Sequence, residues 1–579
     1  MGGGIHLRTQ YKAFILFVFA ISIGCKETES HKENLSFNLL EASSEVKLNY
    51  RNESYSRFPK KISNVAHLMR ISPSVAVSDI NGDGFPDIYF TNSKPGVPNQ
   101  LLLNSGKGYF KDISKKSNIG FINTEKVVSS KANFIDFDND GDQDLFLLTN
   151  YIPKLFINNG DMTFTDVTSQ SGIKSYMFSF ASNFLDFNRD GYIDIVYAAY
   201  FKPFDVLNPN TFYFTPNSVM EADNGGPIVL LKNKGNNTFE EVDLGLKSSG
   251  FVQAIAVYDF QGDGFPDLWM ATDYNTNKLF LNQNGTQFID KSELLARSRS
   301  RTGMSATIAT LDQKTNVPTV FVSHTFQSKV TVSGNEAWQI KGQGSDLKVE
   351  NTSNLMGIHN CQWSWAAVFA DLDNDTDEDL IISNGFMTGK TDKSYWFQFT
   401  QMVGASRKYQ SDSRNWPALQ DYSWSGKQQN CLFLNEGNQF RNVANETDFK
   451  QDDSDGRGLA AIDYLNSGNI SLVEVNYNQP LKFYKNVPLA KNDWIGFQLT
   501  GTSSNRNAIG SFVKVYFDQR TLVKYLAYNN GFMSQSDSRI HFGLGKGNKI
   551  KKIEVKWPSG KVQLISDYTL NQYNRVTER

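Results

Sequence analysis

Five short acidic segments carry the residue types that bind a hard metal ion. The first reads Asp79, Asn81, Asp83, Gly84 and Asp87, so side-chain oxygens occupy positions 1, 3, 5 and 9 and a glycine occupies position 6. Calcium takes about six to eight oxygen ligands, and the glycine allows a sharp bend with a positive φ. Position 7 can add a backbone carbonyl. Strands flank the segment and the twelfth-position glutamate of an EF-hand is missing, so we predict a calcium loop within a β-hairpin.

The same spacing recurs four more times along the chain. Packed carboxylates repel one another unless a cation neutralises them. One such cluster could be a solvated turn, but five in register favour a metal. Magnesium prefers water-rich octahedral sites and zinc prefers His or Cys, so the pattern predicts five calcium sites. The further ligands are Asp136, Asp138, Asp140 and Asp144; Asp186, Asn188, Asp190 and Asp194; Asp259, Gln261, Asp263 and Asp267; and Asp371, Asp373, Asp375 and Asp379, with Thr376 in place of the glycine.

Each acidic loop lies between two short apolar strands, and a second signature follows most copies. That signature is a strand ending in Asn, a Gly-rich turn and another strand that begins near Phe, as in PKLFINNGDMTFTDVT. Each repeat therefore contains four strands.

Two further copies of the repeat are degenerate. The gap between the fourth and fifth intact loops is about twice the usual length, and SATIATLDQKTNVPTVFVSH, residues 305–324, fits it. A lysine, Lys314, stands at its position 5. The other degenerate copy is the last repeat, residues 458–477, whose loop keeps only one carboxylate, that of Asp463. We expect no metal in either loop.

Seven four-stranded units predict an all-β fold with a seven-bladed β-propeller. A solenoid is the alternative, but it needs capping repeats. Residues 36–42, SFNLLEA, could instead complete the last blade, so ring closure is favoured. The predicted domains are a signal peptide at 1–24, a polar tether at 25–35, the propeller at 36–488 and a small C-terminal β-domain at 489–579.

The first residues resemble a bacterial lipoprotein signal. Arg8 and Lys12 precede an apolar run at 13–24 that ends at Cys25. The run is too short to span a bilayer, which takes about 20 helical residues, so a cleaved signal is predicted. Gly24 before Cys25 fits the lipobox, although Ser22 stands where Leu, Val or Ile is usual. Lipidation of Cys25 and display on the outer membrane, at the cell surface or its periplasmic face, are expected; ordinary secretion is the alternative.

The loops resemble FG-GAP or VCBS-type repeats, and the last part of the chain resembles the ASPIC/UnbV domain. The ASPIC/UnbV resemblance rests on residues 503–517, 529–545 and 553–561, the last reading IEVKWPSGK. With both features, the chain resembles the CRTAC1-like family, including bacterial members of the Bacteroidetes type. This resemblance implies the fold and calcium binding. In the C-terminal domain, Asn505 and Arg506 are expected to order a turn rather than bind a ligand, and His541 to pack in a strand.

Composition and motifs favour a binding or scaffold protein over an enzyme. The 58 basic and 60 acidic residues are too evenly balanced to suggest a nucleic-acid partner. No GxSxG, HExxH or phosphate loop occurs, and the visible aspartate pairs belong to the metal loops. A glycan or protein partner at the cell surface is expected. A polysaccharide lyase or hydrolase, and a purely structural component of an outer-membrane assembly, are the alternatives.

Clustered aromatic residues are the candidates for ligand contact. They occur just before the fifth intact loop and in an insert of the same repeat, and a similar insert spans 201–226; the two could decorate one face. Aromatic side chains stack on sugars or anchor protein partners, but a satellite core is the alternative. Cys361 and Cys431 fall in this repeat and could either pair or remain buried thiols. The candidate contacts are Trp363, Trp365, Trp396 and Trp416.

Overall fold

The computed structural model describes residues 35–53, 72–174, 178–202, 215–247, 250–295, 298, 300–328, 333–342, 344–437, 439–528 and 531–579. The predicted signal peptide, the lipidation site Cys25 and nearly all of the tether lie outside the described residues. Within the described residues, no helix is long and apolar enough to cross a membrane.

Between residues 36 and 488 the described chain contributes seven sets of four antiparallel strands, here called blades one to seven in chain order. The all-β, propeller-like prediction is confirmed. Blade one contains β2 (Val75–Ser78), β3 (Asp87–Phe90), β4 (Gln100–Asn104) and β5 (Phe110–Asp112); blade two β6 (Ser129–Ile135), β7 (Asp144–Thr149), β8 (Lys154–Asn158) and β9 (Phe164–Asp166); blade three β10 (Ser179–Leu185), β11 (Asp194–Ala199), β12 (Ile228–Asn233) and β13 (Phe239–Val242).

The remaining blades follow the same order. The degenerate copy predicted at 305–324 supplies the first two strands of blade five. Blade four contains β14 (Phe251–Tyr258), β15 (Asp267–Asp273), β16 (Lys278–Gln283) and β17 (Gln287–Asp290); blade five β18 (Ala306–Thr310), β19 (Pro318–Val322), β20 (Glu336–Lys341) and β21 (Lys348–Asn351); blade six β22 (Ser364–Ala370), β23 (Asp379–Asn384), β24 (Cys431–Asn435) and β25 (Phe440–Asn442); blade seven β26 (Gly456–Ile462), β27 (Ser471–Asn476), β28 (Lys482–Pro488) and β1 (Phe37–Glu41).

The blades close into a ring. The first strand of each blade contacts the first strand of the next, and β26 of blade seven contacts β2 of blade one. The outer strand of blade seven is β1, which pairs antiparallel with β28 from Phe37–Pro488 to Glu41–Tyr484. This confirms that the segment at 36–42 completes the last blade. Because β1 comes from the opposite end of the repeat region, the pairing also fastens the ring.

Both faces of each sheet are buried against neighbouring blades. In β7, Phe146 and Leu148 pack toward blade three, whereas Leu145 and Leu147 pack toward blade one. The strands therefore read as continuous apolar runs rather than as alternating ones. A fully buried Phe or Leu contributes about 1.5–3 kcal/mol, so these cores between blades stabilise the ring.

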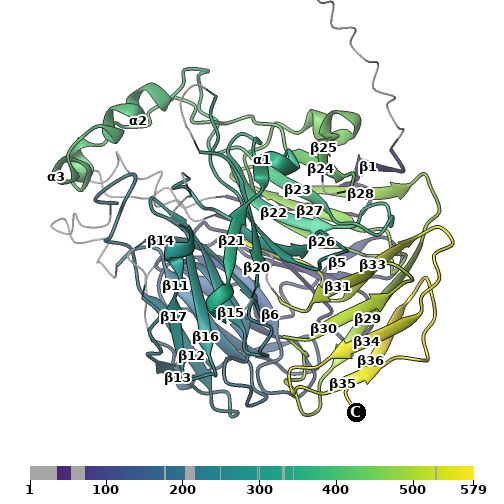
Figure 1. Cartoon of the computed structure of the whole chain (residues 1–579). Helices are drawn as coiled ribbons and strands as arrows, with labels where there is room; N and C mark the ends of the chain where they lie inside the picture. The colour runs from purple at the N-terminus through teal and green to yellow at the C-terminus, as the bar shows by residue number, and fades with distance from the viewer. Residues whose placement is uncertain are drawn as a thin grey trace, which may run out of the picture. The chain divides into compact units, whose positions relative to one another are not determined.

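The C-terminal domain consists of two small sheets packed around one core, which includes Phe497, Val513 and Trp557. Figure 1 shows its strands together in yellow. The first sheet has the order β33 (Ile540–Gly545), β29 (Asp493–Thr500), β36 (Tyr573–Thr577); the second has the order β31 (Thr521–Tyr525), β30 (Phe512–Tyr516), β34 (Lys552–Lys556), β35 (Val562–Leu564).

A segment of this domain, residues 531–537, lies among the first strands of the blades and is here called the plug. Within it, β32 (Ser534–Gln535) pairs in parallel with β2. Gln535 exchanges two hydrogen bonds with the backbone of Phe134 in β6, at 2.7 and 2.8 Å. On other sides, the N–H of Phe532 donates to Ser305 Oγ and the N–H of Asp537 donates to the carbonyl of Ala461. The plug thus fills the centre of the ring.

Blades five and six carry the three α-helices of the described chain. Helix α1 (Ser353–Met356) follows β21. Helices α2 (Trp396–Val403) and α3 (Arg407–Gln410) lie in the insert between β23 and β24, away from the yellow C-terminal domain in Figure 1. A disulfide joins Cys361 to Cys431, so the two cysteines pair.

The inserts of blades three and six contact each other, so they do share one face. Thr215 Oγ1 donates to the carbonyl of Ser411 at 2.8 Å, and the N–H of Val219 donates to Gln410 Oε1 at 2.7 Å. Arg407 forms an ion pair with Asp223 at 3.2 Å.

Candidate metal centre

The loop between β6 and β7 brings three carboxylates together. Oxygens of Asp136, Asp138 and Asp144 lie within 4.8 Å of one another. Asp136 is held in place because its two carboxylate oxygens accept the N–H groups of Asp140 and Gly141, at 3.1 and 2.9 Å. Gly141 has φ 108°, so the sharp bend predicted from the glycine is confirmed. The backbone thus wraps around a small space lined by carboxylate oxygens.

The other intact loops repeat this hydrogen-bond pattern. In each, position 1 accepts the N–H groups of positions 5 and 6, and position 5 accepts the N–H group of position 7. The residue at position 6 has a φ of 87° to 103° in these loops, including Thr376 of blade six, where a β-branched residue is unusual. The position-1 residues with this pattern are Asp79, Asp186, Asp259 and Asp371.

The loops differ in how many carboxylates converge. In blade six, oxygens of Asp371, Asp373 and Asp375 also lie within 4.8 Å of one another. In blades one and three an asparagine at position 3 donates its amide to the position-5 aspartate, at 3.0 Å for Asn81 and 2.9 Å for Asn188. In blade four the amide of Gln261 donates to Asp267 at 3.2 Å. Blades two and six therefore offer the most negative oxygen sets.

Position 9 is anchored by a residue of the third strand. In blade two, Asp144 accepts the N–H of Phe137 at position 2 with one oxygen and the N–H of Asn158 with the other, at 3.0 and 2.8 Å. The Asn158 amide then donates to the carbonyl of Ile80 in the loop of blade one. The same asparagine link joins other neighbouring loops through Asn104, Asn233, Asn282 and Asn486. The sequence pattern showed these asparagines at the end of the third strand, but their role in linking blades was not predicted.

Burial and mutual repulsion make the aspartates hard to ionise without a cation. Burial is the largest cause, and it raises the pKa of Asp136 to about 7 and that of Asp144 to about 8; neighbouring aspartates raise both further. Burial likewise raises the pKa of Asp186 to about 6 and places the pKa of Asp371 well above its usual range. A divalent cation among these oxygens would remove the repulsion and favour the ionised carboxylates. The donor set therefore fits a hard cation.

The two degenerate loops are built differently. In blade five, Asp312 accepts from the backbone of Lys314 and from the hydroxyl of Thr315, so its carboxylate is used within the turn. In blade seven, Asp463 keeps the position-1 hydrogen bonds. The guanidinium of Arg539 from the C-terminal domain donates there to the carbonyl of Asp463 at 3.2 Å.

Arg539 brings a positive charge to the blade-seven loop from inside the protein. It forms an ion pair with Asp537 at 2.6 Å and donates to Asn466 Oδ1 at 2.5 Å and to the carbonyl of Gly84 at 3.2 Å. It also stacks on Tyr573, 3.8 Å from the ring centre. Arginine is always charged in proteins, so its guanidinium group supplies a positive charge at this loop. No sequence motif indicated this arrangement, because Arg539 belongs to a different domain.

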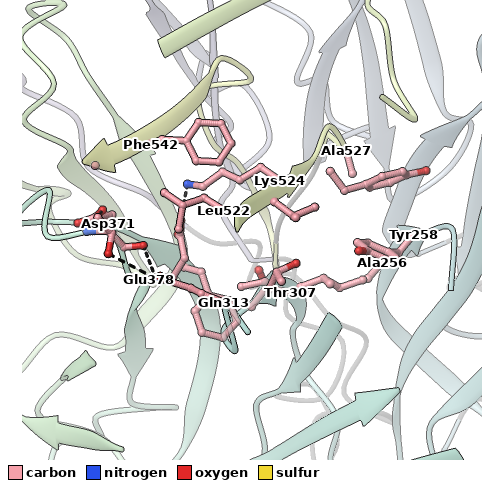
Figure 2. A pocket seen from close by; sticks show the side chains of 18 of the residues that line it. Ala256, Tyr258, Thr307, Gln313, Asp371, Glu378, Leu522, Lys524, Ala527 and Phe542 are labelled. Atoms are coloured by element: carbon pink, nitrogen blue, oxygen red, sulfur yellow. Dashed lines mark hydrogen bonds and ion pairs between the residues drawn. The ribbon is translucent and has the colours of Figure 1, made fainter. Parts of the chain in front are cut away.

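The C-terminal domain covers the other acidic loops as well. Asn507 accepts the N–H of Asp136 at 2.9 Å, and His541 shares a 2.6 Å hydrogen bond with Asn374. Burial lowers the pKa of His541 well below its usual value, in line with the packed histidine predicted. A cavity remains between this domain and blades four to six, where Lys524 reaches toward Glu378 and forms an ion pair with it (Figure 2).

The turn that follows β29 contains Asn505 and Arg506. The side chain of Asn505 exchanges hydrogen bonds with the backbone of Ile509, at 2.8 and 2.9 Å. The N–H of Arg506 donates to Asn139 in the blade-two loop at 3.0 Å. Asn505 therefore orders the turn, while Arg506 contacts the acidic loop.

The four tryptophans predicted as ligand contacts are all buried. Trp416 is 1% exposed and donates its indole N–H to the carbonyl of Gln410, and Trp396 donates to Ser425. Trp363 and Trp365 line a cavity together with Phe386. The structure therefore places two of the four in a packed cluster of the insert and the other two on the wall of a cavity.

Two family models and two known proteins are similar to parts of the chain. Residues 136–197 match the model described as FG-GAP-like repeat, and residues 501–579 match the one described as ASPIC and UnbV. Cartilage acidic protein 1 of Xenopus tropicalis is 28% identical over 127 residues, which cover 21% of this chain and 19% of that protein. The chain thus matches about a fifth of the length of that relative.

A solved lectin structure is also similar. Its title describes specific recognition of non-reducing terminal N-acetylglucosamine by an Agrocybe aegerita lectin; the match has a TM-score of 0.36 and 14% identity, and covers 72% of this chain and 94% of that one. The first family match falls on the acidic loops and strands of blades two and three, and the second on the domain that covers them. The chain thus contains an FG-GAP-like repeat region at residues 136–197 and an ASPIC and UnbV domain at residues 501–579.

Proposed function

We propose that this chain is a calcium-binding scaffold protein, exported and anchored to the outer membrane through Cys25, that binds a glycan or protein partner at the cell surface. The observation that carries the calcium proposal is the convergence of three carboxylates in each of the loops of blades two and six. The similarity of the chain to FG-GAP-like repeats and to the ASPIC and UnbV domain supports a binding role. The aspartates are committed to the loops, so the role is binding rather than catalysis.

Calcium suits the loops better than other common metals. The side-chain donors are all oxygens, and the loop backbone offers a further carbonyl at position 7. The predicted ligand sets contain neither His nor Cys, which zinc prefers. The arrangement supports one ion in each of blades one, two, three, four and six. In blade five Lys314 stands at position 5, and in blade seven Arg539 supplies the positive charge.

The number of bound ions tests this proposal directly. We expect about five calcium ions per chain by elemental analysis after dialysis against calcium-free buffer treated with chelating resin. Asp138→Asn and Asp373→Asn, which leave an oxygen in place but remove a charge, should weaken the two most acidic sites. Asp142→Asn is the matched control, because it removes a charge from the same loop at a side chain outside the predicted ligand set. A folded protein that takes up no calcium at millimolar concentration would rule the proposal out.

The anchor is tested separately from the metal. A metabolic label for fatty acids should mark the wild-type protein and leave Cys25→Ala unlabelled, and the wild type should fractionate with outer membranes. An unlabelled wild-type protein in the culture medium would instead support ordinary secretion.

A further inference from the structure

A cavity lies at the end of the ring that is remote from the acidic loops. Five of its residues hold equivalent places in successive blades, six residues before the first loop position. Six extended residues span about 20 Å, so these side chains lie far from the metal loops. The plug provides one more wall through Phe532, whose ring lies 4.9 Å from that of Trp365. The five equivalent residues are Phe180, Gln253, Met304, Trp365 and Arg457.

Two buried polar atoms on the walls of this cavity have no hydrogen-bond partner in the described structure. One is the indole N–H of Trp363, a donor, and the other is Gln253 Oε1, an acceptor. The two residues are only 6% and 5% exposed. Leaving such a buried group without a partner is unfavourable because its lost hydrogen bonds to water are not replaced. A ligand that pairs with either atom would therefore gain binding energy.

A buried carboxyl lies on the same wall as Gln253. Asp273 accepts the hydroxyl of Tyr200 at 2.7 Å and the N–H of Tyr274 at 3.0 Å. Its neighbours therefore hold its carboxyl group in a fixed orientation beside the cavity. This adds an acceptor next to the amide oxygen of Gln253.

The rest of the wall is aromatic. Trp363 stacks on Phe386 with ring centres 4.4 Å apart, and Trp424 packs edge-on against Trp363 at 5.3 Å. The two inserts contribute to this wall. Trp424 belongs to the blade-six insert, and Ala222 of the blade-three insert donates its N–H to the carbonyl of Tyr274. Aromatic rings of this kind pack against flat apolar faces.

We propose that this cavity binds a single sugar ring. A sugar hydroxyl both donates and accepts, so it can pair with the indole N–H of Trp363 and with Gln253 Oε1, while the C–H face of the ring packs on the aromatic wall. The cavity volume of about 60 Å³ corresponds to about four to six water-sized spaces. This admits one ring edge and no extended chain, so the terminal residue of a glycan fits best. The inference rests on the proposed binding role and names its ligand class.

The indole resonance of Trp363 provides a direct test. The chain has nine tryptophans, so the spectrum of the full-length, calcium-loaded protein labelled with ¹⁵N-tryptophan has few signals, and Trp363→Phe identifies the one that matters. We expect at least one of glucose, galactose, N-acetylglucosamine and glucuronate to shift this resonance in a saturable way. Mannitol, which has similar hydroxyls and no ring, should leave it unmoved.

Variants separate binding at the cavity from binding elsewhere. Trp363→Phe and Gln253→Leu should each weaken sugar binding at least tenfold, followed through the indole resonance of Trp365, which also lines the cavity and remains in both variants. Trp557→Phe is the matched control, since Trp557 lies in the C-terminal domain and its indole N–H is paired with Gln563 at 3.1 Å. The other indole signals report whether each variant is folded.

Two outcomes would overturn the inference. One is a folded protein whose Trp363 resonance does not shift with any of the four sugars at about 100 mM, a concentration that would detect even a Kd of about 100 mM. Water alone would then fill the cavity. The other is sugar binding that Trp363→Phe and Gln253→Leu leave intact. Calcium content measured on the same sample keeps this result apart from the metal proposal, because a protein with its calcium and no sugar binding refutes only the cavity assignment.

Discussion

Replacing Asp138 by Asn should change the stability of the protein in opposite directions with and without calcium. Oxygens of Asp138, Asp136 and Asp144 lie within 4.8 Å of one another, and Asp138 raises the pKa of both partners. At that separation two unit charges repel by about 1 kcal/mol in water and about 3 kcal/mol at an effective dielectric of 20. Asp138 is half-buried, so the lower figure applies. In chelator, Asp138→Asn should therefore stabilise the protein by about 1 kcal/mol.

In calcium the same variant loses a ligand charge. A site saturated about 100-fold above its Kd contributes about 2.7 kcal/mol to folding, and a tenfold weaker site loses about 1.4 kcal/mol of this. The melting temperature of the variant should thus lie roughly 1 to 3 °C above wild type in chelator and a similar amount below it in calcium.

The assay is the melting temperature of wild type, Asp138→Asn and Asp142→Asn. Each protein is measured in chelator and in about 1 mM calcium, which is about 100-fold above the Kd of a typical calcium sensor. Asp142 is not among the groups that raise the pKa of Asp136 or Asp144, so its variant should follow wild type in both conditions. If Asp138→Asn shifted the melting temperature equally in both buffers, or if the two variants behaved alike, the reasoning about this loop would be refuted.

Three further predictions follow from the charges and cross-links. Because burial holds the pKa of Asp136 at about 7, against an ordinary value near 4, the chelated protein should lose stability as pH rises from about 4 to 8; the gain in melting temperature from calcium should be larger at pH 8 than at pH 5, and a gain independent of pH would contradict this. Arg539→Leu should lower the free energy of unfolding by up to about 3 kcal/mol, since the largely buried carboxylate of Asp537 would lose its ion pair; a urea-unfolding loss under about 1 kcal/mol would show the pair to be dispensable. Cys361→Ala combined with Cys431→Ala opens a loop with a separation of 70 residues and should cost about 4 kcal/mol, measured against the oxidised protein; equal stability of the two would contradict the estimate.

The periodic features of the fold could be read from the sequence. Each blade repeats the same strands and loop, so even the copy at 305–324, which keeps only Asp312 of the acidic loop residues, was recognisable by its apolar strands and its place in the series. The sharp bend at Gly141 followed from elementary backbone sterics. The closing strand at 36–42 was predictable because the last repeat lacked a fourth strand.

The features that depend on contacts between distant segments could not be read in this way. The plug occurs once, so no repeat reveals it, and its hydrogen bond between Gln535 and Phe134 joins residues 401 positions apart. The same holds for Arg539 at the blade-seven loop. The pairing of Cys361 with Cys431 stayed open because sequence separation alone does not bring two thiols together. The signature asparagine, such as Asn158, was visible in most repeats, but the carbonyl of Ile80 that it contacts lies in the preceding blade.

The plug has a consequence for the order in which this protein acquires its native state. The strand β1, near the start of the described chain, completes blade seven, and residues 531–537 complete the centre of the ring. The first step requires the chain as far as Pro488 and the second requires residues 531–537, and contacts over such distances form slowly. Until residues 531–537 are made, the edge of β2 that pairs with β32 stays unpaired, so the nascent chain would depend on protection from aggregation.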